Sequence, residues 1–476
     1  MTALTIGATD RQWDLLRWLC FMAILGFVFI EPNPTSRTWS ADGGLGTVEG
    51  SLFQQLLWPV ILLFVITCVA GRWKAVYNQF DVTFFLFMSW ALLTTFFAIS
   101  PSVSIRRYVF MLLVVVTVLI AVSSISDQRQ VWRALFLCFA ITTVYALFYA
   151  IAIPRFGLHQ ATGQEPHLAG LWRGQFAHKN VAAPLFALMI LTIWRLRSKL
   201  NWLYYYSLLP LQVMFLWFAG GKTAAYLTIP VFLLTEFITR SRNVIAICSA
   251  VIIPLAIANF ITIGSVANDS AKYLASKIVG DASFTGRTEI WQVLLYFTSL
   301  NPITGAGFQS FWQLNTDSPA LRYGGSWLNT AFYGHQGYLD LTATVGIPGV
   351  ILALGFVLWR PLKDVCAIRD RANPLFAACV SIWLMPLFLA ITESNLFDKA
   401  DPSWVMMLIG IAFLRRMVIE ERQSGNYVVP QQVMPQFTDH DLRATDHYLR
   451  LLAASSVRTG PQAALEDRSQ DSPSGN

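Results

Sequence analysis

Long apolar runs alternate with short polar segments along most of the chain, and this pattern predicts membrane-spanning helices. A run of about 20 apolar residues can cross a hydrocarbon core of about 30 Å as a helix. Hydropathy marks about twelve such runs. They lie near residues 15–30, 52–70, 82–99, 108–125, 134–153, 181–194, 202–220, 223–238, 244–263, 338–359, 374–391 and 404–414. The pattern therefore predicts an all-α polytopic membrane protein.

Basic residues in the connections predict the orientation of these helices. Arg and Lys gather in the connections on one side of the predicted bundle, and only the pair Arg106–Arg107 departs from this rule. Short connections rich in Arg and Lys face the cytoplasm. We therefore expect both termini in the cytoplasm, with the less basic connections outside.

The composition agrees with a membrane protein and argues against several kinds of partner and site. Hydrophobic residues make up 55% of the 476 residues and charged residues 13%, whereas soluble domains carry about 25% charged residues. The net charge of +7 then reflects topology, and no nucleic-acid partner is expected. The six cysteines lie in apolar runs or a short basic connection, so no disulfide framework is expected. His159, His167 and His178 match no standard metal-ligand spacing.

Three outer connections are longer than the rest, at residues 31–51, 154–180 and 264–337. The largest is long enough to form a small helical cap. Within it Ile290, Val293, Leu294 and Phe297 recur at the i, i+3, i+4, i+7 spacing of an amphipathic helix. We expect residues 1–417 to form the transmembrane domain. Residues 418–476 are polar and are expected to be a disordered cytoplasmic tail.

Ionisable side chains gather at the outer ends of the predicted spans and in the outer connections. A proton-coupled transporter usually carries such residues near mid-span, where this chain has almost none. The distribution favours a site at the outer membrane–water boundary. The residues concerned are Arg173, His178, Lys179, Lys222, Arg287, Glu289, His335, Asp340, Glu393, Asp398 and Lys399.

Cations beside hydrocarbon suit a ligand with a lipid tail and a phosphate head. Guanidinium groups bind phosphate oxygens bidentately and can stabilise a departing pyrophosphate. The alternative is that each cation only anchors its span at the lipid head groups. The segment "FAGGKTAAY" is not a P-loop, because Leu216 stands where the motif needs Gly. Lys222 in that segment remains a candidate phosphate contact.

His335 is the candidate general base. It lies in "GHQGYLDLTATVGIPG", directly before a predicted span, and histidine commonly accepts a proton from an attacking hydroxyl near neutral pH. Asp340, about one helical turn later, could orient His335 or cap the helix. A hydrogen-bonded interfacial histidine without a catalytic role is the alternative.

Five segments, taken in order, resemble the bacterial O-antigen ligase and polymerase superfamily, and most closely its ExoQ-like exopolysaccharide-polymerase branch. They are "GQFAHKNVAA", "GGKTAAY", "TGRTEIWQVLLYFTSLNPITGAGFQSFW", "GHQGYLDLTATVGIPGV" and "TESNLF". The resemblance implies a GT-C-like helical glycosyltransferase in the bacterial inner membrane, with one large helical periplasmic loop at residues 264–337. Its donor would be a polyprenyl-pyrophosphate-linked oligosaccharide presented at the periplasmic face.

The resemblance also implies roles for individual residues. Arg287 would bind the pyrophosphate, with Arg173, Lys179 and Lys222 as further contacts. His335 would be the base, with Asp340 and Glu393 in support. No cofactor, metal or nucleotide sugar is expected. Many relatives have Arg at the position of Lys222 and Asn at the position of Gln336, and the first difference removes a bidentate phosphate contact.

The leading hypothesis is a polymerase that joins lipid-linked repeat units into an exopolysaccharide. The first alternative is a ligase that transfers glycan to a lipid A core. The alternative from another class is a transporter or flippase of the lipid-linked oligosaccharide. The expected partners are the lipid-linked oligosaccharide and membrane lipids, with other proteins of polysaccharide assembly and export as candidates.

Overall fold

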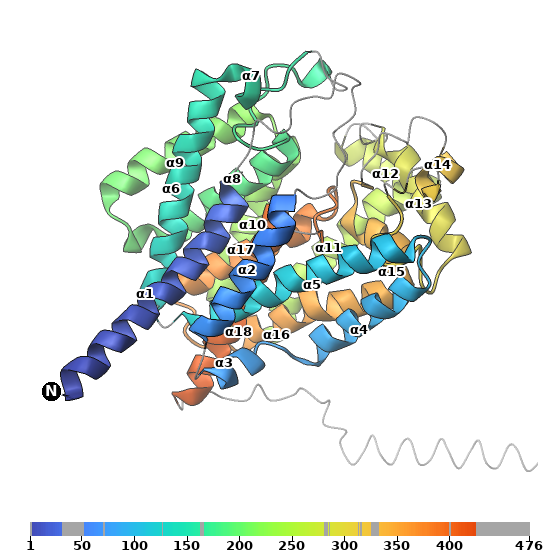
Figure 1. The fold of residues 1–476 in the computed structure, drawn as a ribbon. Coiled ribbons are helices and arrows are strands. Elements are labelled where there is room, and N and C mark those ends of the chain that lie inside the picture. The colour runs from blue at the N-terminus through green and yellow to red at the C-terminus, as the bar shows by residue number, and fades with distance from the viewer. Residues whose placement is uncertain are drawn as a thin grey trace, which may run out of the picture. The chain divides into compact units, whose positions relative to one another are not determined.

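Helices dominate the computed structural model (Figure 1), as the apolar runs predict. It describes residues 2–30, 52–69, 72–125, 127–161, 166–279, 284, 286–312, 314, 317–324, 333–398 and 401–424. The connection 31–51, Lys399 and most of the expected tail lie outside these residues. Residues 1–428 form one unit by their contacts.

Each expected span falls on a helix. The long helices are α1 (Thr2–Phe29), α2 (Leu52–Cys68), α4 (Val82–Phe96), α5 (Pro101–Ser124), α6 (Gln128–Ala152), α8 (Lys179–Leu196), α9 (Trp202–Ala219), α10 (Lys222–Arg240), α11 (Val244–Ala267), α15 (Gly337–Leu354), α17 (Pro374–Leu389) and α18 (Pro402–Gln423). The last helix continues beyond residue 417, where the tail was expected to begin. Shorter helices are α3 (Trp73–Tyr77), α7 (Pro154–Gly157), α12 (Asp269–Val279), α13 (Arg287–Leu300), α14 (Pro319–Gly324) and α16 (Arg360–Ala367), which follows the π-helical turn Gly355–Trp359.

Seven helical stretches among the described residues are long and apolar enough to cross a membrane. Three shorter apolar helices lie at Leu56–Cys68, Val82–Phe96 and Pro374–Leu389. The protein is therefore a multi-pass, all-α membrane protein. The count of twelve spans stays a prediction. Helices α9 and α10 are helical as expected, but they belong neither to the seven long apolar stretches nor to the three shorter apolar helices.

Helices α17 and α18 form the centre of the unit. Every residue of α17 from Leu375 to Leu389 is buried, and Trp383 and Trp404 are fully enclosed. Helix α11 differs, because only 17% of its apolar window is buried. Its outward isoleucines would be unfavourable in water but suit contact with lipid tails.

Three helices can be oriented relative to one another by contacts at their ends. Arg195 near the end of α8 pairs with Glu236 near the end of α10. Arg371, just before α17, donates from Nη1 to the carbonyl of Ile238 in α10 at 3.0 Å. The last turns of α8 and α10 therefore share one end of the bundle with the first turn of α17. It follows that α8 and α10 begin at the end where α17 finishes, which we call the Glu393 end.

The segment 301–312 is fixed against α15 at the Glu393 end. Gly346 breaks α15 with φ of 72°, and a Cβ there would lie 1.9 Å from the carbonyl oxygen of Ile303. The amide of Ile347 donates to Pro302 O at 2.9 Å. Arg107, an exception to the basic-residue pattern, donates to the carbonyl of Trp312 at 3.0 Å. The hydrogen bond to Trp312 gives Arg107 a structural role, which explains why an arginine lies in this connection.

Candidate functional site

A single carboxylate, that of Glu393, joins the two residues expected to be catalytic. Its Oε1 lies 3.0 Å from Nη2 of Arg287, and its Oε2 lies 3.1 Å from Nδ1 of His335. Arg287 also donates from Nη1 to the carbonyl of Thr392. The side chains of Arg287 and His335 remain 22% and 24% exposed, whereas Glu393 is 13% exposed. A ligand can therefore reach the cation and the imidazole, with the carboxylate behind them.

Three segments distant in sequence meet here. Arg287 is the first residue of α13, which Gly286 precedes with φ of 83°. His335 stands two residues before α15, and Glu393 follows α17. The amide of Gly337 donates to Ala390 O at 2.7 Å, so the start of α15 is held against the chain that leaves α17.

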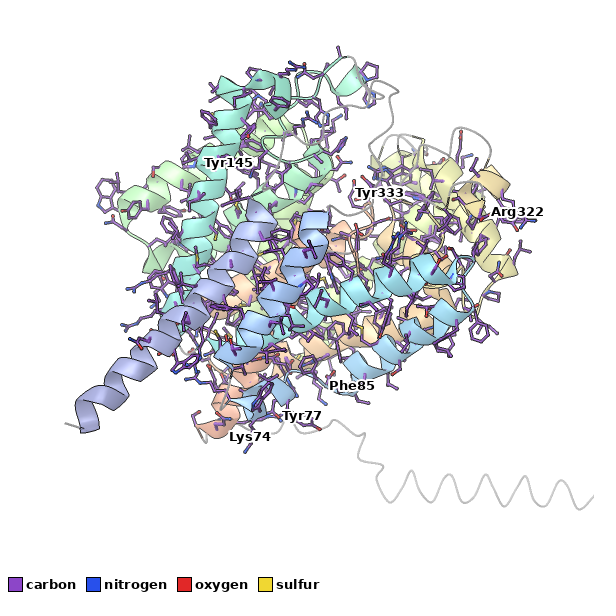
Figure 2. All side chains as sticks on the ribbon, in the orientation of Figure 1. Lys74, Tyr77, Phe85, Tyr145, Arg322 and Tyr333 are labelled. Atoms are coloured by element: carbon purple, nitrogen blue, oxygen red, sulfur yellow. The ribbon has the colours of Figure 1, made fainter. Side chains whose placement is uncertain are left out.

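His335 is held in an uncommon backbone conformation. Its φ of 51° lies in the left-handed region that few non-glycine residues adopt. The ring of Tyr333 lies beside its imidazole, with centroids 4.6 Å apart. Figure 2 shows Tyr333 in the upper half of the unit and Lys74 at its lower edge. Outliers of this kind are concentrated at functional sites.

The charges around Glu393 keep its carboxylate ionised. Burial alone would raise the pKa of Glu393. The Arg287 guanidinium and the hydrogen bond from His335 outweigh that cost, so the pKa lies below its ordinary value. An ionised Glu393 favours the His335 tautomer that carries its proton on Nδ1, which leaves Nε2 free to accept a proton.

Asp340 supports the site through the main chain. Its Oδ2 accepts from the amide of Gly334 at 3.0 Å, and its Oδ1 accepts from Trp312 Nε1 at 2.6 Å. Trp291 Nε1 donates to the carbonyl of Gly334 at 2.9 Å. Capping the helix was one of two alternatives for Asp340, but the cap comes from Gln336, whose Oε1 accepts from the amide of Leu339 at 2.6 Å. Asp340 thus positions the residue before His335.

A second polar group lies where α8 begins and where α9 turns into α10. Lys179 Nζ lies 3.4 Å from the carbonyl oxygen of Gly220. His178 caps α8, because its Nδ1 accepts from the amide of Asn180 at 3.1 Å. Lys222 is exposed and makes no side-chain hydrogen bond or ion pair within the described residues. This group contains two of the expected phosphate-binding cations.

Arg173 occupies the loop before this group. Its Nε donates to Phe156 O at 3.0 Å and its Nη1 to Ala177 O at 3.1 Å. These bonds tie the loop to itself. The expected contact of Arg173 with phosphate stays a prediction.

The two groups share the Glu393 end of the bundle. Helices α8 and α10 begin at this end, and the chain from α17 to Glu393 leaves at it. Gln336 Nε2 also donates to Asn259 Oδ1 of α11 at 2.7 Å, which joins the start of α15 to the last third of α11. The clustering of ionisable residues at one end is the arrangement that the sequence predicts.

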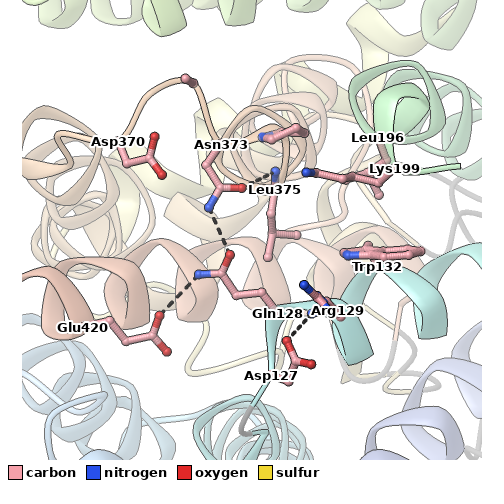
Figure 3. A pocket seen from close by; sticks show the side chains of 12 residues that line it. Asp127, Gln128, Arg129, Trp132, Leu196, Lys199, Asp370, Asn373, Leu375 and Glu420 are labelled. Carbon is pink, nitrogen blue, oxygen red and sulfur yellow. Dashed lines mark hydrogen bonds between the residues drawn. The ribbon is translucent and has the colours of Figure 1, made fainter.

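A cavity of about 770 Å³ lies at the opposite end, around the starts of α6 and α17 (Figure 3). Gln128 crosses it, accepting from Asn373 at 3.0 Å and donating to Glu420 at 3.3 Å. The cavity is remote from Arg287 and His335 and contains none of the expected site residues. No group of three His, Cys, Asp or Glu residues within the described part of the chain could hold a metal ion.

Sequence reasoning missed two features of the site. It named Glu393 only as a supporting residue, and the signal for its bridging position is the segment "TESNLF" alone. It treated Arg107 as an exception to the charge pattern, although this residue holds the segment that carries Trp312. Glu393 lies 106 positions from Arg287 and 58 from His335, and Arg107 lies 205 positions from Trp312.

Comparison with known proteins finds two similarities. Residues 179–354 match the sequence model described as O-antigen ligase. The matched range runs from the start of α8 to the end of α15. The exopolysaccharide production protein ExoQ of Rhizobium meliloti strain 1021 is 25% identical to it over 315 residues, covering 62% of this chain and 67% of that protein. The predicted resemblance to the O-antigen ligase family and to ExoQ is confirmed.

The range that matches the O-antigen ligase model contains most of the candidate site. Lys179, Lys222, Arg287, His335 and Asp340 lie inside the matched range. Arg173 precedes the range and Glu393 follows it. The carboxylate that joins Arg287 to His335 is therefore supplied from outside the matched segment.

Proposed function

We propose that this protein is a membrane-embedded glycosyltransferase that polymerises polyprenyl-pyrophosphate-linked oligosaccharide repeat units into an exopolysaccharide. The observation that carries the proposal is the contact of Glu393 with both Arg287 and His335. It unites a cation for a pyrophosphate leaving group with a base for an acceptor hydroxyl. The similarity to ExoQ, whose name states exopolysaccharide production, supports the polymerase.

The reaction is a substitution at the anomeric carbon of the donor sugar. The acceptor hydroxyl oxygen forms the new bond to this carbon, and its proton passes to Nε2 of His335. The bond between the anomeric carbon and the phosphate oxygen breaks, and its electron pair leaves with the polyprenyl pyrophosphate. Arg287 stabilises that charge with the N–H groups that Glu393 and Thr392 do not use. Glu393 stabilises the imidazolium that forms.

Lys179 and Lys222 extend the positive surface at the Glu393 end, where they contact the polyprenyl pyrophosphate, with Arg173 in the adjoining loop. Their lysine ammonium groups act as compact charges that need no planar partner. The chemistry uses no metal, since the cations and the base supply the charge stabilisation and proton transfer.

The orientation follows the distribution of basic residues. The Glu393 end faces the periplasm and both termini lie in the cytoplasm, since the Arg-rich connections gather at the other end. The membrane is the bacterial inner membrane. Lipid-linked repeat units reach the site from the outer leaflet, and other proteins of polysaccharide assembly and export receive the product.

The test uses three variants of the full chain reconstituted with lipid-linked repeat units. Arg287→Ala and His335→Ala should each abolish elongation, measured as the size distribution of the glycan product. Arg322→Ala is the matched control, because Arg322 is an exposed arginine in the same long connection (Figure 2). Normal elongation by both site variants, with intact protein, would overturn the proposed function.

A further inference from the structure

A second, smaller cavity of about 280 Å³ lies beside α13, where α11 ends and α12 begins. Its polar lining includes Asn268, Asp269 and Lys272 from the corner between the two helices. Thr288 and Gln292 of α13 close the other side. None of these residues belongs to the proposed catalytic group, so the cavity has no role in the function described above.

The cavity and the catalytic group lie on two sides of the same helical turn. Arg287 and Thr288 are consecutive residues, and consecutive helix positions point about 100° apart. Arg287 reaches Glu393, while Thr288 and Gln292, four positions apart and thus on one face, line the cavity. Because a helix with its side chains is about 10–12 Å across, a ligand longer than one sugar ring can span both places.

The charges in the lining distinguish between a sugar and a phosphate. Lys272 brings one positive charge and Asp269 one negative charge, so the lining has no surplus of positive charge. A phosphate site needs such a surplus. The lining also has the amide of Gln292 and the hydroxyl of Thr288, which can both donate and accept hydrogen bonds. Asn268 adds an NH₂ donor, since its Oδ1 already accepts from the amides of Ser270 and Ala271. Sugar hydroxyls, which also do both, match this set.

We propose that this cavity is a binding subsite for one sugar ring of the lipid-linked glycan whose pyrophosphate contacts Arg287. The proposal rests on the proposed function, since it assumes a glycan at that site. Lys272 and Gln292 hold the sugar hydroxyls from opposite walls of the cavity. The subsite fixes the glycan relative to the reacting bond without touching the reacting atoms.

The test compares two probes on the full chain in lipid nanodiscs. One is the lipid-linked repeat unit extracted from a strain that lacks the protein, and the other is polyprenyl pyrophosphate without sugar. The variant Lys272→Ala/Gln292→Ala removes a side chain from each wall. The control Lys277→Ala/Ser299→Ala changes exposed residues of the same two helices that do not line the cavity.

The subsite predicts that Lys272→Ala/Gln292→Ala weakens binding of the repeat unit about 10- to 100-fold, as two lost hydrogen bonds imply. Binding of bare polyprenyl pyrophosphate and the behaviour of the control should not change. Equal weakening of both probes would make the cavity a phosphate site and overturn the sugar assignment. No change, while Arg287→Ala abolishes binding, would overturn the subsite and leave the proposed function standing. If the unaltered protein bound neither probe, the proposed function would fail and the subsite with it.

Discussion

Replacing Glu393 by Gln tests the catalytic group with the smallest change of shape. In the structure Oε1 faces Nη2 of Arg287 and Oε2 faces Nδ1 of His335, at 3.0 and 3.1 Å. Glutamine has one oxygen and one NH₂ group in these two positions. Either orientation sets its NH₂ against a donor, the guanidinium or the Nδ1–H. The clash with His335 is relieved if the imidazole carries its proton on Nε2 instead of Nδ1. Nε2 can then no longer accept a proton from the acceptor hydroxyl, so His335 cannot act as the base.

The expected loss follows from the role of the base. Proton transfer by a positioned side chain contributes about 10²- to 10⁴-fold to a rate, which is about 3–5 kcal/mol in the barrier. We therefore expect Glu393→Gln to lower the elongation rate by about 10²- to 10⁴-fold. Glu393→Asp keeps the charge with a shorter reach and should retain more activity than Glu393→Gln.

The assay is a double-mutant cycle on the reconstituted full chain. Elongation rates are measured for Glu393→Gln, His335→Ala and the double variant, with melting temperatures recorded to exclude unfolding. If Glu393 acts through His335, the second change should cost little in the His335→Ala protein. If the two changes lowered the elongation rate independently, so that their factors multiplied in the double variant, Glu393 would not act through His335. An unchanged elongation rate for Glu393→Gln would refute the same conclusion.

Three further predictions concern Arg173, Asp401 and the effect of a metal chelator. Arg173→Ala should lower the free energy of unfolding by about 1–3 kcal/mol, because it frees two loop carbonyls; a melting temperature equal to that of the unaltered protein would contradict this. Burial and Asp398 raise the pKa of Asp401, which caps α18, to about 7. The folded protein therefore retains a proton that the unfolded chain releases near pH 4, and stability falls as pH rises from about 4 to 7. Asp401→Asn keeps the cap and should raise the melting temperature above pH 7 but not near pH 4; an equal shift at both would exclude this titration. Elongation should survive treatment with EDTA, and loss of activity restored by added metal would contradict a metal-independent reaction.

The helices could be predicted from sequence because their signal is local. The run 374–391 is apolar apart from Ser381, and α17 and α18 are buried as such runs require. The amphipathic stripe at Ile290, Leu294 and Phe297 predicted α13, and all three are buried. Helix α12 was not predicted separately, and its buried positions are the small residues Ala271 and Ala275.

The candidate site was only partly predictable, because its geometry depends on distant contacts. Residue type and position beside the membrane singled out Arg287 and His335. The pairing of Arg287 with Glu393 joins residues 106 positions apart, and no periodicity reports such a distance. Arg173 has the same residue type and a similar position, yet its donors reach carbonyls within its own loop. Residue type and position along the chain therefore do not distinguish Arg173 from Arg287.

The most direct measurement is the size profile of cell-surface and lipid-linked glycans in a deletion strain, complemented with the unaltered gene or with Arg287→Ala. The proposed polymerase predicts that the unaltered gene restores long exopolysaccharide. With Arg287→Ala, single lipid-linked repeat units should accumulate on the periplasmic face. Long lipid-linked chains that are made but never transferred to a lipid A core would contradict the polymerase and indicate a ligase. Repeat units retained on the cytoplasmic face would indicate a flippase.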